Sequence, residues 1–129
     1  MTGTGLVVLG WEYRRTTLKE GRMPKYLFRS RHTPEGAKGL IKDGGTSRRA
    51  ESERAVASVG GKLECFYYAF GATDVFIIAD LPDNASAASL NLAVAASGAI
   101  DSETVVLLTP EEIDEATKKG AAYRPPGAS

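Results

Sequence analysis

The sequence is poor in the residues that build disulfides and metal centres. Cys65 is the only cysteine among 129 residues, and His32 is the only histidine. One chain therefore cannot form an internal disulfide or a cluster of thiolate ligands, and a histidine-based metal centre would need further ligands. We expect a reducing, cytoplasmic environment and no resident metal or cofactor.

The sequence also lacks an excess of charge of either sign, because 16 Lys and Arg balance 16 Asp and Glu. Nucleic-acid modules and electrostatic membrane binders depend on concentrated basic residues, so we expect neither nucleic acid nor membrane as a partner. Long apolar runs are missing too, since the patch from Leu6 to Leu9 is too short for a membrane span or an export signal. Gly3-Thr4-Gly5 lacks the third glycine of a dinucleotide motif.

The remaining composition, 43% apolar and 25% charged, is that of one globular domain. Residues 1–22 show no clear helical or strand period, whereas a strand-like run begins directly after Met23. We therefore expect residues 1–22 to be a poorly ordered extension and residues 23–129 to be the folded domain. The alternative is that Leu6 to Leu9 adds an edge strand.

The order of predicted elements defines a fold class. Strands are expected over residues 25–31, 63–70, 74–81 and 105–108. Helices are expected to begin at the caps Thr33, Asp83 and Thr109, the first broken by Asp43-Gly44-Gly45 and resuming to residue 59. The resulting βαββαβ order with a C-terminal helix predicts an α+β, ferredoxin-like fold with a four-stranded antiparallel sheet.

Both faces of this predicted sheet are apolar. Strand alternation places Leu63, Cys65 and Tyr67 on one face, and Phe66, Tyr68 and Phe70 on the other. Helices can cover only one face, so we expect a second copy of the chain to cover the other in a homodimer. The stretch 84–100 carries no charge, which fits either a helix packed closely on the sheet or a further oligomer contact.

Several segments resemble the GYD domain family of small bacterial proteins. They are Phe70-Gly71-Ala72-Thr73-Asp74-Val75, residues 80–85, Lys25-Tyr26-Leu27 and Thr33-Pro34-Glu35-Gly36, and the likeness covers residues 23–126. The resemblance implies a dimeric α/β barrel. Gly71 and Asp74 are retained, but Thr73 stands where the family's tyrosine usually lies. The family's function is largely undefined, and other proteins with this barrel include monooxygenases and regulatory effector-binding modules, so the fold does not decide the function.

The candidate site residues are few. His32, where the first strand meets the first helix, and Asp74, after the hairpin turn, are the weak catalytic candidates; Asp74 could instead hold the turn. Arg29 and Arg31 share a strand face, where they could bind an acid or pair with carboxylates such as Glu64. Together with Asp74 and Tyr68 they are the candidate ligand-binding residues.

These observations predict a small homodimer that binds a small organic molecule in or beside the barrel. The alternative is a noncatalytic oligomerisation or regulatory module. An interior with room and unpaired polar groups would favour ligand binding, whereas one filled by Phe66, Tyr68 and Phe70 would favour assembly.

Overall fold

The structure, a computed structural model, describes residues 23–128. The extension predicted for residues 1–22 lies outside the described residues. The strands are β1 (Lys25–His32), β2 (Lys62–Tyr68), β3 (Val75–Asp80) and β4 (Ile100–Leu107), and the helices are α2 (Pro34–Asp43), α3 (Gly45–Ser58), α4 (Asn84–Ala96) and α5 (Pro110–Thr117).

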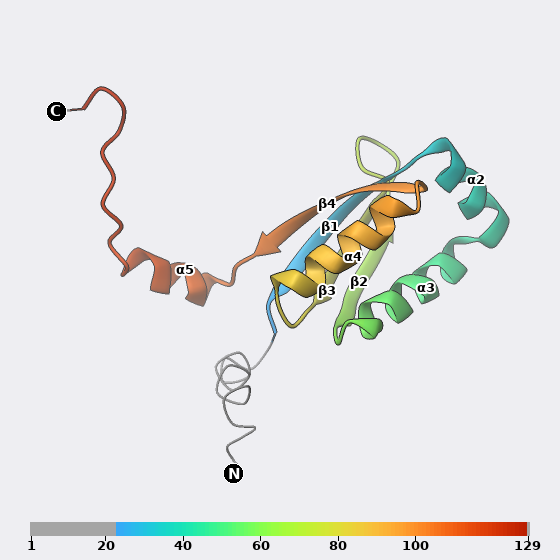
Figure 1. The fold of residues 1–129 in the computed structure, drawn as a ribbon, viewed down its shortest axis with the longest axis horizontal. Helices are drawn as coiled ribbons and strands as arrows, with labels where there is room; N and C mark the ends of the chain where they lie inside the picture. Colours follow the sequence, from blue (N-terminus) through green and yellow to red (C-terminus); the bar gives the residue numbers. More distant parts are fainter. Residues whose placement is uncertain (1–22, 129) are drawn as a thin grey trace, which may run out of the picture.

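The strands form one antiparallel sheet in the order β2-β3-β1-β4. The predicted ferredoxin-like α+β fold is confirmed, with α3 and α4 lying across one face of the sheet (Figure 1). That face carries the core, in which Tyr26, Phe28 and Ala79 of the sheet pack with Val56 of α3 and Ala87 of α4. The opposite face is covered by no helix of the described chain.

The helix starts follow the predicted caps. The hydroxyl of Thr33 accepts a hydrogen bond from the Gly36 N–H, and the carboxylate of Asp83 accepts one from the Ser86 N–H. Each cap satisfies an amide that the first helical turn leaves without a partner. The predicted break between α2 and α3 is also confirmed, because Gly44 has φ of +87°, a conformation that favours glycine.

Strand β2 differs from the predicted alternation. Leu63 pairs with Ala79, but Cys65 pairs with Ile78, so Glu64 is an extra residue in a β-bulge. The bulge places Leu63 on the helix-covered face together with Phe66 and Tyr68. The prediction that Leu63 shares a face with Cys65 and Tyr67 is therefore wrong. The strand ends at Tyr68, and Phe70, predicted on the face of Phe66 and Tyr68, is fully exposed.

Strand β4 begins at Ile100, five residues before the predicted start at residue 105. Its first half was missed because Asp101, Ser102 and Glu103 give it little apolar character. These residues belong in the sheet because they face matching partners on β1: Asp101 lies opposite Arg31, and Glu103 opposite Arg29. Cross-strand charge pairs of this kind stabilise a sheet without burying apolar surface.

Helix α5 has a full capping box. The Thr109 hydroxyl accepts from the Glu112 N–H while the Glu112 carboxylate accepts from the Thr109 N–H. The helix nevertheless has no buried residue, and it projects away from the sheet and the other helices (Figure 1). None of the helices in the described part of the chain has the length and apolar character needed to cross a membrane.

Candidate functional site

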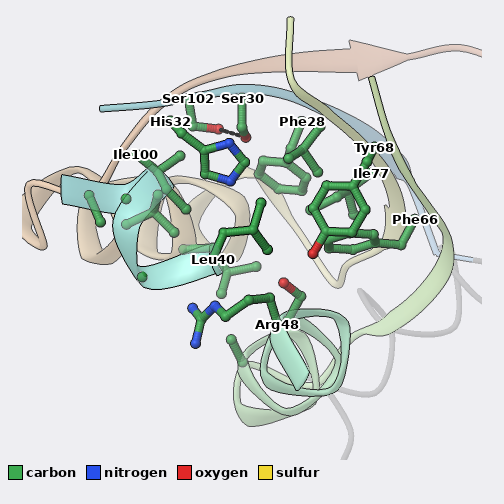
Figure 2. A pocket seen from close by; sticks show the side chains of 18 of the residues that line it. Phe28, Ser30, His32, Leu40, Arg48, Phe66, Tyr68, Ile77, Ile100 and Ser102 are labelled. Carbon is green, nitrogen blue, oxygen red and sulfur yellow. Dashed lines mark hydrogen bonds between the residues drawn. The ribbon is translucent and has the colours of Figure 1, made fainter. Parts of the chain in front are cut away.

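A cavity of about 300 Å³ lies between the sheet and helices α2, α3 and α4. Every strand contributes residues to it: Phe28 and His32 from β1, Phe66 from β2, Ile77 from β3 and Ile100 from β4. Figure 2 shows Phe66 and Tyr68 on the opposite side of this cavity from His32 and Ile100. A cavity of this size can enclose a small organic molecule.

Aromatic side chains form one wall of the cavity. The rings of Phe66 and Tyr68 meet edge to face, with centroids 5.1 Å apart. The Tyr68 hydroxyl donates to the Gly45 carbonyl at 3.0 Å, which ties β2 to the start of α3. Partial burial raises the pKa of Tyr68, an effect that the charges of Arg48 and Arg49 partly oppose. Tyr68 therefore remains a neutral hydrogen-bonding wall residue at physiological pH.

Polar side chains gather at the end of the cavity where β1 and β4 meet. Ser30 lies opposite Ser102 in the sheet, and the Ser30 hydroxyl donates to the Ser102 hydroxyl at 3.1 Å (Figure 2). His32 follows on the same face of β1, with its side chain 15% exposed. A ligand at this end of the cavity thus meets hydroxyl and imidazole groups.

Asp74 lies next to His32, as a residue that orients it. Asp74 Oδ2 accepts a hydrogen bond from the His32 main-chain N–H at 2.9 Å and lies 3.7 Å from His32 Nδ1. The main chain of Asp74 is itself fixed, because its N–H donates to the Ser30 carbonyl and its carbonyl accepts from the Ala69 N–H. The structure therefore brings together the two catalytic candidates, although they are 42 residues apart in sequence.

The cavity contains further charged groups on the helices. Glu35 and Asp43 of α2 and Arg48 of α3 line it. Arg48 Nη1 lies 3.8 Å from Asp43 Oδ2, so its charge is partly balanced. Glu35 is mostly exposed and its Oε2 lies 3.9 Å from Lys38 Nζ, so its charge is partly balanced as well. No group of three or more His, Cys, Asp or Glu side chains within residues 23–128 could bind a metal ion.

Asn91 is a site residue that the sequence did not single out. It lies on α4 and lines the cavity, and its buried Oδ1 has no hydrogen-bond partner among the described residues. A buried acceptor without a partner costs about 1–3 kcal/mol, although Oδ1 itself has almost no surface open to the cavity. The signal was an Asn between two leucines in the middle of an uncharged helix.

Arg29 and Arg31 lie away from this cavity, on the uncovered face of the sheet. Arg29 Nε donates to Glu103 Oε1 at 3.2 Å, and Arg31 is exposed opposite Asp101. The predicted partner Glu64 instead binds Lys25, whose Nζ lies 2.7 Å from both Glu64 and Asp80. Lys25 Nζ donates a hydrogen bond to each carboxylate, and these bonds, the one to Asp80 most and the one to Glu64 next, raise the pKa of Lys25.

The structure is that of a ferredoxin-like α+β domain with a cavity between the sheet and its helices. A model of the GYD domain family matches residues 26–117. The chain belongs to the GYD domain family. Neither the curated proteins nor the solved structures include a match to it.

Proposed function

We propose that this protein binds a small, mainly apolar organic molecule in the cavity between the sheet and its helices. The observation that carries the proposal is the cavity of about 300 Å³ itself, which has a mainly apolar lining and hydroxyl and imidazole groups at one end. Assembly alone does not explain this open volume, because a cavity costs packing energy that a filled core would retain. Phe66 and Tyr68 form a wall of the cavity without filling it.

We also propose that the protein is a cytoplasmic homodimer in which the uncovered faces of two sheets pack together, as in a dimeric α/β barrel. The uncovered face presents a patch of apolar side chains whose outer members are accessible: Tyr67 is 68% exposed and Phe76 is 37% exposed. Each large apolar side chain gains about 1.5–3 kcal/mol when it is fully buried. A second sheet of the same chemistry would bury this patch.

Gly39 offers a test of binding in the cavity. It lies within α2, lines the cavity, and has no atom within 4 Å of the position that a Cβ would take. We expect the Gly39→Leu side chain to occupy part of the cavity and to abolish ligand binding, whereas Gly39→Ala should still bind the ligand. Both replacements suit a helix better than glycine, so neither variant should be less stable than the wild type.

The measurement is native mass spectrometry of the purified wild-type protein and the two variants, combined with NMR titration of small aromatic compounds. We expect a ligand, co-purified or added, that binds the wild type and Gly39→Ala at least tenfold more tightly than Gly39→Leu. Equal behaviour of all three proteins, or saturable binding by none of them, would contradict the proposal and favour a noncatalytic assembly module. The same spectra give the subunit count.

A further inference from the structure

The polar end of the cavity presents a hydrogen-bond acceptor on His32. Nδ1 is the nitrogen that faces Asp74, and Nε2 makes no hydrogen bond to any residue of the described chain. When the proton of a neutral imidazole is on Nδ1, beside the carboxylate, Nε2 is an acceptor. Such an acceptor selects a ligand that donates through an O–H or N–H group.

The Asp74 carboxylate lies beside the Nδ1 side of the His32 ring. The distance of 3.7 Å from Asp74 Oδ2 to His32 Nδ1 is too long for a good hydrogen bond but short enough for an ion pair with an imidazolium. The main-chain hydrogen bonds of Asp74 to Ser30 and Ala69 hold the carboxylate beside the ring. The side chains are only partly exposed, His32 at 15% and Asp74 at 29%, so water screens this interaction less than it would on the surface.

The charges in the cavity decide between classes of acidic ligand. Glu35, Asp43 and Arg48 line it together with His32. A carboxylate or phosphate ligand is already ionised near neutral pH and has no proton to give to Nε2, and the Arg48 charge that could bind it is partly balanced by Asp43. A neutral hydroxyl compound has such a proton, because it can enter uncharged and ionise only beside His32.

From these observations we propose that the ligand is a phenol or enol whose hydroxyl group gives its proton to Nε2 of His32. This inference rests on the proposed binding function. In the step, the ligand O–H bond breaks, the electron pair remains on the ligand oxygen, and the proton forms a new bond to Nε2. The imidazolium then faces the Asp74 carboxylate. The oxyanion lies beside the imidazolium, and the Ser102 hydroxyl, which accepts a hydrogen bond from Ser30, can donate its own hydrogen to it. No oxidant or reductant is needed.

Para-nitrophenol is a suitable probe, because its phenolate is yellow and its neutral form is nearly colourless. We would titrate it into the untagged full-length protein at a pH close to its own pKa, where about half of the free probe is ionised and an ordinary imidazole, with a pKa of about 6.5, is mostly neutral. The wild type should convert most of the bound probe to phenolate. Because His32 is the only histidine, its ring nitrogens give a single set of NMR signals, which should move to imidazolium positions as the probe binds.

Three variants separate the possible outcomes. His32→Gln should bind the probe within about tenfold of the wild-type affinity but leave it colourless, and Asp74→Asn should give an intermediate phenolate fraction. Ile41→Ala is the control and should behave as the wild type, because Ile41 is an exposed residue of α2 that does not line the cavity. Circular dichroism establishes that each variant is folded.

The failures of the two proposals differ. One outcome overturns the proton transfer alone: the probe binds the wild type, does not bind Gly39→Leu, and stays neutral when bound. Equal phenolate formation by His32→Gln and the wild type overturns it too. An unchanged histidine spectrum with a yellow bound probe also overturns it. Absence of saturable binding to the wild type contradicts the cavity as the ligand site and so removes the basis of both proposals.

Discussion

Single side chains at the ends of elements join distant parts of this chain. The hydroxyl of Thr33 caps α2 and also donates to the Gly98 carbonyl at 2.9 Å, while its N–H donates to the Ala99 carbonyl at 3.0 Å. His32, one residue earlier, binds Asp74. The polar end of the cavity is therefore also the place where β1, the hairpin before β3, and the loop before β4 are tied together.

Asp83 gives a prediction for the dependence of stability on pH. Hydrogen bonds from the main chain and side chain of Ser86 lower the pKa of the Asp83 carboxyl below its ordinary value of 3.8. The folded protein thus binds fewer protons here than the unfolded chain. This contribution to stability is complete above that ordinary value and is lost as the pH falls through the lower pKa of the folded state.

Asp83→Asn is the matched variant, because asparagine also caps a helix but does not titrate. We expect the Tm of the wild type, relative to the Tm of this variant, to fall as the pH is lowered from about 7 to about 3. Thermal unfolding followed by circular dichroism at a series of pH values measures it. A difference that is constant with pH would show that the Asp83 carboxyl does not make this contribution.

At the scale of elements, the sequence predicted the helix caps and the order of strands but not the details of two strands. Caps and glycine breaks are local signals, so Thr33, Asp83 and Thr109 could be identified directly. The bulge at Glu64 and the first half of β4 depend on pairing with the neighbouring strand. The alternation of apolar residues along a single strand does not reveal that pairing. The contact between His32 and Asp74 has the same origin, since sheet pairing brings them together.

A close approach of α2 to the loop before β4 gives a second prediction. A Cβ added at Gly36 would lie 1.9 Å from the main-chain oxygen of Ala99. We expect Gly36→Ala to lower the free energy of unfolding by roughly 1–3 kcal/mol, because the helix or the loop must shift. Urea unfolding of the two proteins measures the difference.

Gly39→Ala is the control for this prediction, since it makes the same change one turn later in the same helix with open space at the Cβ position. It should raise the free energy of unfolding by roughly 0.5–1 kcal/mol, the ordinary gain when alanine replaces glycine in a helix. Two variants that change stability in the same direction would show that the approach of α2 to Ala99 is not what constrains Gly36.

At the scale of the whole molecule, the two faces of the sheet have separate roles. The helix-covered face carries the core and the cavity, whereas the uncovered face carries ion pairs around an apolar patch. The residues of this patch are Leu27, Cys65, Tyr67, Phe76, Ile78 and Val105. The sequence predicted that both faces are apolar, but it could not show that Arg29 and Arg31 lie on the face without the cavity.

The proposed dimer can be tested with a pair of matched substitutions. Ile78→Asp places a charge in the apolar patch, whereas Ile41→Asp places one on α2, where Ile41 is already 84% exposed. We expect light scattering during size-exclusion chromatography to give a dimer for the wild type and Ile41→Asp, and a monomer for Ile78→Asp. The reason is that an isolated carboxylate is costly to bury between two sheets.

Tyr67→Asp is a second variant for the case in which Ile78→Asp does not fold, because Tyr67 is mostly exposed in the single chain. It should also give a folded monomer. A wild-type protein that is monomeric at micromolar concentration, or dimers that persist in both patch variants, would contradict the sheet-to-sheet dimer.

The bulge in β2 has a consequence for comparing this chain with its relatives. One additional residue, Glu64, reverses the parity of β2, so that Leu63 and Tyr68 share the cavity face although their positions are odd and even. A relative without the bulge would be one residue shorter between these two positions and would keep both side chains inside by regular alternation. Alignments of the family at this strand should therefore allow a one-residue gap at Glu64, since an ungapped alignment would exchange the lining of the cavity for the surface of the opposite face.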